Sequence, residues 1–106
     1  MMLTFGNGVA IDLGVLDGDC YSEAEVINSQ GVVAGLSFPC DGDQRPFLWE
    51  NGHLYDLNQL IRMSPGTYFT QPFVINDRGE IGGIGVDPGC DMDEVCGHAF
   101  VLVPLI

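Results

Sequence analysis

The stretch Ile27-Asn28-Ser29-Gln30-Gly31-Val32-Val33-Ala34-Gly35 recurs later in the chain as Ile75-Asn76-Asp77-Arg78-Gly79-Glu80-Ile81-Gly82-Gly83. Each copy places the pattern Asn-x-x-Gly between two runs of apolar residues. The asparagine side chain can bond the backbone two residues further on, and the glycine accepts the positive φ that closes this kind of turn. The two stretches therefore predict two strand–turn–strand units of the same construction.

Matches on either side of these stretches extend the similarity. Ile11-Asp12-Leu13 recurs as Tyr55-Asp56-Leu57, and Pro46-Phe47-Leu48 recurs as Ala99-Phe100-Val101, in the same order along the chain. Three matches in one order predict two copies of a repeat, at residues 9–52 and 53–106, within a single domain that spans 1–106.

Short apolar runs between turn residues divide each copy into four expected strands. These lie at 10–13, 22–27, 32–37 and 45–50 in the first copy, and at 53–57, 70–75, 80–85 and 98–103 in the second. A single helical turn is expected near 58–63. The predicted fold class is all-β, with two four-stranded antiparallel repeats arranged like propeller blades or packed as a sandwich or barrel. Asn51-Gly52 predicts a hairpin that couples the two repeats by backbone pairing.

Three motifs resemble the bacterial HAF repeat, a family named for His-Ala-Phe. They are Asp12-Leu13-Gly14-Val15-Leu16-Asp17-Gly18, the stretch from Ile27 to Gly35, and His98-Ala99-Phe100. The resemblance covers the chain from Val9 onward. It implies four-stranded, propeller-like blades and an extracellular origin, and it brings no catalytic residues. The first copy departs from the pattern, because Arg45-Pro46-Phe47 stands where the family has His-Ala-Phe.

The charge balance restricts the classes of partner. The chain has 15 acidic residues and only 3 basic ones, which gives a net charge of −12. Such a charge repels nucleic acids and anionic membrane surfaces, and it favours a cation or a basic protein as partner. The sequence contains no apolar run long enough to span a bilayer and no recognisable signal peptide, so neither feature is expected.

Topology predicts where the acids gather. In a four-stranded meander, the connections after the first and third strands lie at the same end of the sheet. The acids expected there are Asp17, Asp19, Asp41, Asp43, Asp87, Asp91, Asp93 and Glu94. They form either a solvated acidic surface or a binding site for a cation, for which calcium is the candidate.

The four cysteines are expected in the same loops, where they form disulfides or stay as free thiols. The predicted pairs are Cys90 with Cys96, within one loop, and Cys20 with Cys40. Cys90, Cys96 and His98 have in addition a spacing that resembles a partial zinc site.

Catalytic motifs are absent from the sequence: there is no nucleophile elbow, phosphate loop or dinucleotide fingerprint. We therefore expect a non-catalytic binding or interaction module that uses the acidic loops. The alternative is a small glycosidase-like hydrolase that acts through paired loop carboxylates. Two repeats leave apolar faces and strand edges uncovered, so a homo-oligomer is expected, with a dimer favoured. The alternative is a monomer in which the two repeats pack face to face within one chain.

Overall fold

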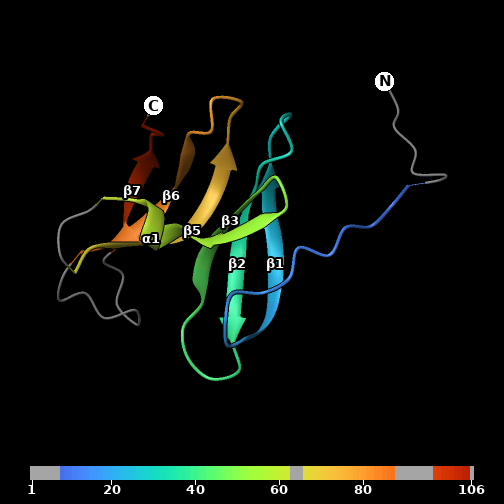
Figure 1. Cartoon of the computed structure of the whole chain (residues 1–106). Helices are drawn as coiled ribbons and strands as arrows, with labels where there is room; N and C mark the ends of the chain where they lie inside the picture. The colour runs from blue at the N-terminus through green and yellow to red at the C-terminus, as the bar shows by residue number, and fades with distance from the viewer. Residues whose placement is uncertain (1–7, 63–65, 88–96, 106) are drawn as a thin grey trace.

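The computed structural model describes residues 8–62, 66–87 and 97–105, and within them the chain forms seven strands and one helical turn (Figure 1). In chain order these are β1 (Asp19–Ile27), β2 (Val33–Pro39), β3 (Arg45–Glu50), β4 (His53–Asp56), α1 (Leu57–Leu60), β5 (Tyr68–Ile75), β6 (Ile81–Val86) and β7 (Gly97–Leu102). The predicted all-β class is confirmed.

The strands form two open antiparallel sheets rather than one closed sheet. The first has the order β1-β2-β3-β4 and the second the order β5-β6-β7. Asn51 and Gly52 join β3 to β4 with φ of 52° and 81°, so the hairpin expected from this pair is confirmed. In both sheets every neighbour along the chain is also the neighbour in space.

The strand arrangement corrects the sequence-based prediction in two ways. Residues 10–13 form no strand, and the fourth strand of the first sheet is β4, from the region assigned to the second copy. The second sheet has three strands in the described part of the chain instead of four. The fourth strand is added by the Asn51-Gly52 hairpin, which pairs β4 with the edge of β3, whereas residues 10–13 do not pair with the β1 edge where the meander placed them.

The two Asn-x-x-Gly turns have the same hydrogen bonds. Asn28 Oδ1 accepts from the amides of Gln30 and Val32, both at 3.0 Å. Asn76 Oδ1 accepts from the amides of Arg78 and Glu80, again at 3.0 Å. The turn glycines, Gly31 and Gly79, have φ of 81° and 80°, which is the left-handed conformation that glycine adopts without strain.

The turns also contact each other and so hold the two sheets together at one end. Asn28 Nδ2 donates to the Asn76 carbonyl at 2.9 Å, and the Ser29 amide donates to Asp77 Oδ1 at 2.9 Å. The hydrogen bonds from the Ser29 side chain and amide lower the pKa of the Asp77 carboxyl from its ordinary value of about 3.8.

We expect Asp77→Ala to destabilise the chain slightly, with an effect that depends on pH. Because the pKa of Asp77 is lowered in the folded state, its contribution is fully present above about pH 3.8 and is lost as the pH falls through the folded pKa. Denaturant unfolding from pH 7 down to pH 2 should therefore show the two proteins converging. Asp77→Asn, which keeps an acceptor oxygen, is the control; a difference from wild type that stays constant with pH in the alanine variant contradicts the assignment.

The core consists of two apolar clusters on opposite faces of the first sheet. The inter-sheet cluster contains Ala34, Leu57, Phe69 and Ile81, and lies between the sheets. The outer cluster lies on the face that points away from the second sheet. Its buried members are Leu16, Val33 and Phe47, and Leu13, Trp49 and Leu54 pack against them. Adjacent residues Val33 and Ala34 belong to different clusters because side chains alternate across a strand.

The helix in the described part of the chain is α1, which is a single turn. None of the described residues belongs to a helix long and apolar enough to cross a membrane.

Candidate functional site

The acidic candidates lie at the end of the molecule opposite the two Asn-x-x-Gly turns. We call this the loop end: it is the end at which β1, β3, β5 and β7 begin. Among the predicted acids, Asp17, Asp41, Asp43 and Asp87 are exposed there, in the connections around the strands. Asp91, Asp93 and Glu94 lie outside the described residues.

Asp19 behaves differently from the other acids, because its side chain is only 3% exposed. Its Oδ1 atom forms an ion pair with Arg45 Nη2 at 3.0 Å, across the intervening strand β2. Its Oδ2 atom is buried and has no hydrogen-bond partner among the described residues. The arginine is therefore the group that compensates this buried carboxylate, and Asp19 serves the fold rather than an exposed cation site.

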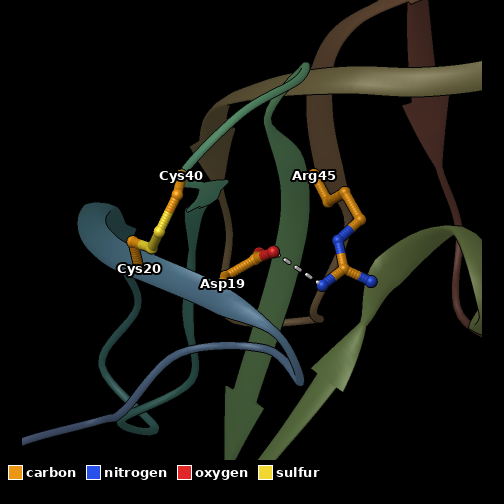
Figure 2. Close-up of a disulfide and its surroundings, with 4 residues drawn as sticks. All are labelled: Asp19, Cys20, Cys40 and Arg45. Atoms are coloured by element: carbon orange, nitrogen blue, oxygen red, sulfur yellow. Dashed lines mark ion pairs between the residues drawn. A yellow bond between two sulfur atoms is a disulfide. The ribbon is translucent and has the colours of Figure 1, made fainter.

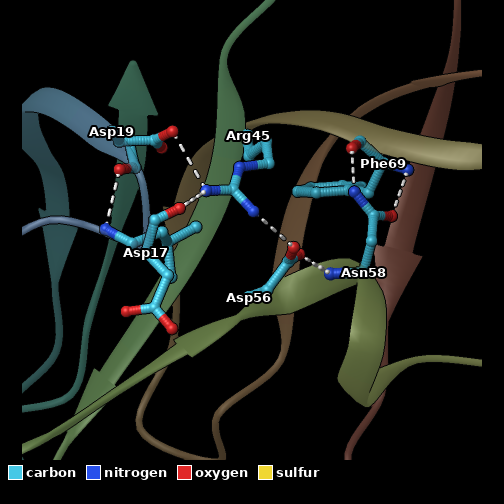
Figure 3. A network of polar contacts seen from close by, with 8 residues as sticks. Asp17, Asp19, Arg45, Asp56, Asn58 and Phe69 are labelled. Atoms are coloured by element: carbon cyan, nitrogen blue, oxygen red, sulfur yellow. Dashed lines mark hydrogen bonds and ion pairs between the residues drawn. The ribbon is translucent and has the colours of Figure 1, made fainter. Parts of the chain in front are cut away.

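Arg45 connects three segments at the loop end (Figure 3). Besides Asp19 it contacts Asp56 Oδ2 at 3.5 Å, and it donates to the Asp17 carbonyl at 3.0 Å. Asp56 uses its other oxygen, Oδ1, to accept from the Asn58 amide at 3.0 Å and so begins α1. Both oxygens of Asp56 are thus engaged within the protein.

Asn58 continues this network to the second sheet. Its side-chain amide donates to the Phe69 carbonyl and accepts from the Phe69 amide, both at 2.8 Å (Figure 3). A side chain that pairs with both backbone groups of one residue imitates a neighbouring strand. The network running from Asp19 through Arg45, Asp56 and Asn58 therefore fixes the first sheet against the start of β5.

A disulfide joins Cys20 to Cys40 beside this network (Figure 2). It links the start of β1 to the loop that follows β2. This is one of the pairs that the sequence left open against free thiols. The other predicted pair, Cys90 with Cys96, lies outside the described residues, as do two of the three residues of the zinc hypothesis. The third, His98, contacts Asp87 through Nε2 at 2.9 Å, with both side chains more than half exposed.

Two hollows flank Arg45. The larger, of about 400 Å³, is lined by polar and apolar groups that include Asp17, Tyr55 and Asp56. The smaller, of about 190 Å³, lies between Asp43 and Tyr68. In the described ranges, no three histidine, cysteine or acidic side chains come together as ligands for one metal ion. The structure thus does not gather the described calcium candidates, Asp17, Asp19, Asp41, Asp43 and Asp87, into one site.

Among the described carboxylates, Asp17 and Asp56 do not form the pair that the hydrolase hypothesis needs. Asp17 and Asp56 line the same hollow, but Asp56 is held by Arg45 and by the Asn58 amide. A general acid or a nucleophile must have a free oxygen within reach of a substrate. The arrangement around Arg45 is that of a structural ion-pair network.

An aromatic pair, exposed Tyr21 and half-buried Phe38, lies at the same end of the first sheet. The rings of Tyr21 and Phe38 stack with their centroids 4.6 Å apart and their planes 6° apart, and Tyr21 is 56% exposed. The pair adjoins the disulfide, because Tyr21 follows Cys20 directly. Sequence reasoning missed both this stack and the Arg45 network. A usable signal was present: Arg45 is the only arginine or lysine within residues 9–52.

We compared the chain with protein-family models, with curated proteins and with solved structures, and none of the three comparisons found a match.

Proposed function

We propose that the chain is a non-catalytic interaction module that binds a basic peptide or protein surface through its loop end. The observation that carries this proposal is the combination of exposed carboxylates with an aromatic stack whose tyrosine is exposed. Asp41 and Asp43 are exposed in the loop after β2, and Tyr21 and Phe38 stack beside that loop. Carboxylates attract lysine and arginine side chains, and aromatic faces bind the same cations.

The loop end is held rigid by covalent and ionic links. The disulfide links Cys40, at the start of the acidic loop, to β1. Arg45, at the end of that loop, forms an ion pair with Asp19. A surface that is ordered before binding loses less conformational entropy in the complex. The disulfide also supports a setting in an oxidising compartment, in line with the extracellular origin that the HAF resemblance implies.

The proposal includes a two-repeat, blade-like architecture. Its support comes from equivalent details in the two halves of the chain. The two turns have the same hydrogen bonds, with Asn28 corresponding to Asn76. Gly35 and Gly83 lie at corresponding positions, and each faces a backbone carbonyl and a phenylalanine ring. In this arrangement the described acids Asp17, Asp41, Asp43 and Asp87 of the two repeats belong to one binding end.

A binding experiment with a defined cationic probe tests the loop end. We expect a fluorescent decalysine peptide to bind the protein at low ionic strength and to be released as salt is added, because exposed charges are screened. Asp41→Asn/Asp43→Asn should weaken binding by roughly three- to tenfold, as expected for two rim charges.

The matched control is Glu25→Gln/Glu50→Gln, which removes two exposed carboxylates away from the loop end. It changes the net charge by the same amount, so its effect measures the general field of the protein. Equal weakening by the two double variants, or no binding by the wild type, contradicts the proposed site.

A further inference from the structure

Residues 9–12 have the sequence of a strand but pair with no described strand. Ala10-Ile11-Asp12 corresponds to Leu54-Tyr55-Asp56, which forms β4 and completes the first sheet on the edge of β3. In the structure the counterpart runs away from the sheets as an extended segment, drawn in blue in Figure 1. Val9 is 87% exposed and Ile11 is 68% exposed. Residues 9–12 are thus an apolar segment that pairs with no strand in the described part of the chain.

The residues after this segment show where it belongs. Asp12 Oδ1 accepts from the Gly14 amide at 2.9 Å, just as Asp56 Oδ1 accepts from the Asn58 amide. Leu57 then packs between the sheets, onto the sheet that follows β4. Leu13 packs in the corresponding way onto the first sheet, in the outer cluster. By this correspondence, residues 9–12 stand where they would complete a sheet that precedes the first one.

The second sheet lacks the corresponding fourth strand among the described residues. Its edge strand in the described part of the chain is β7, the counterpart of β3, and no described strand lies on its outer side. Phe100 and Leu102 point into the inter-sheet cluster as Phe47 and Trp49 point into the outer cluster. The edge of β7 therefore has the residue pattern that accepts a fourth strand in the first sheet.

The outward-facing sides of the two sheets also lack a covering layer in the described part of the chain. Val74 and Val101, on the face of the second sheet turned away from the first, are 56% and 68% exposed. Their counterparts in the first sheet, Val26 and Leu48, pack into the inter-sheet cluster. The outer cluster borders a hollow of about 740 Å³ whose lining includes Val9, Ile11, Leu13, Ile27 and Trp49. An apolar face and an apolar hollow are thus both left open, on opposite sides of the molecule.

We propose that a second copy of this chain docks head to tail, with its residues 9–12 added to β7 as the fourth strand of the second sheet. The register follows from that of β3 with β4, in which Phe47, Leu48 and Trp49 face Asp56, Tyr55 and Leu54. Transferred to the open edge, it pairs Phe100 with Asp12, Val101 with Ile11 and Leu102 with Ala10. The exposed face of the second sheet then covers the outer cluster of the copy that donates the strand.

Geometry and charge favour a second copy as the occupant. Residues 9–12 and β7 lie on opposite sides of the molecule in Figure 1, so residues 9–12 do not reach the β7 edge of their own chain. Of the 15 acidic residues, residues 9–12 contain one and β7 contains none, so the repulsion from a net charge of −12 is weak at this interface. A head-to-tail contact closes into a ring when the rotation between copies allows it, and the smallest ring is two copies that exchange strands reciprocally. The inference rests on the proposed two-repeat architecture but is independent of the acidic loop end.

Crosslinking between two singly substituted chains tests both the partner and the register. Ile11→Cys and Val101→Cys are prepared separately and mixed, so that a disulfide between these positions can join only two different chains. Cβ atoms directly opposite in an antiparallel pair are about 5 Å apart, which allows a disulfide with small adjustment. We expect a covalent dimer on a non-reducing gel, and in the mass spectrum a peptide in which the two introduced thiols are joined by a disulfide.

Ile11→Cys mixed with Ala99→Cys is the matched control, because position 99 is displaced by two residues from the proposed register. Equal crosslinking in the two mixtures, or none in either, overturns the proposal. Light scattering of the wild type at micromolar concentration should give a multiple of 11.4 kDa. Ile11→Pro, which removes a strand amide at a position exposed in the single chain, should shift that mass toward the monomer with an unchanged circular dichroism spectrum; a monomeric wild type overturns the inference.

Discussion

Replacing Gly83 with alanine is expected to produce the largest loss of stability of any single methyl addition in the second sheet. A Cβ atom at this position would overlap the backbone carbonyl of Gln71 and the ring of Phe69, both of which are held by the sheet and the core. The carbonyl belongs to the neighbouring strand β5 and cannot move without breaking the pairing of β5 with β6. We expect a loss of about 3 kcal/mol or more in the free energy of unfolding.

The adjacent residue supplies the control. A Cβ atom on Gly82 would meet Val74 Cγ1 at 3.9 Å, which is an ordinary van der Waals contact. Gly82→Ala should therefore change the free energy of unfolding by less than about 1 kcal/mol, and it can stabilise the chain by restricting the unfolded state. Urea denaturation of the two variants measures the difference. Similar midpoints for Gly82→Ala and Gly83→Ala contradict the packing described here.

The same reasoning applies to the first sheet. Gly35 faces the Glu23 carbonyl and lies where a Cβ atom would be 2.8 Å from the ring of Phe47. These glycines occupy corresponding places in the two matching stretches of sequence. Close approach of backbone and ring explains why a residue without a side chain stands in the middle of each strand, where glycine otherwise weakens a sheet.

Local features of the fold were readable from the sequence. The strands around Asn28–Gly31 and Asn76–Gly79, and the Asn51-Gly52 hairpin, depend on residues close together in the chain, and the turn chemistry specifies them. The order of the strands was harder to predict, because each strand must pair with the edge of another strand and composition does not say which segment pairs with which edge. Residues 10–13 have the composition of a strand and were expected beside β1, yet they pair with no described strand.

The candidate site was likewise predictable where it depends on strand direction and unpredictable where it depends on tertiary contacts. Topology placed the exposed acids Asp17, Asp41 and Asp43 at one end because strand direction alone decides that. The role of Asp19 was not predictable from composition, because its partner Arg45 is 26 positions away and reaches it across β2. Burial separates a carboxylate that stabilises the fold from one that is free to bind, and burial depends on the complete tertiary structure.

Substituting Arg45 with methionine is the second change for which we expect a large effect. The apolar part of the side chain is kept, but the buried carboxylate of Asp19 loses its compensating charge while its Oδ2 atom already lacks a partner among the described residues. Removing one member of a buried ion pair costs about 3 to 5 kcal/mol, and the 38% exposure of the Arg45 side chain reduces this to about 2 to 3 kcal/mol.

Arg78→Met is the same substitution at an exposed pair and isolates the contribution of burial. Arg78 is 83% exposed and contacts Glu80 at 3.2 Å, so its loss should cost less than about 1 kcal/mol. Adding Asp19→Asn to Arg45→Met should restore part of the lost stability, because an amide needs no compensating charge. If thermal unfolding shows the same loss for Arg45→Met and Arg78→Met, or if Asp19→Asn lowers the stability of Arg45→Met further, the buried ion pair does not hold the loop end together. A loss confined to Arg45→Met, with recovery in the double variant, assigns that role to the contact between Arg45 and Asp19, and the exposed acids of the loop end remain available to a partner.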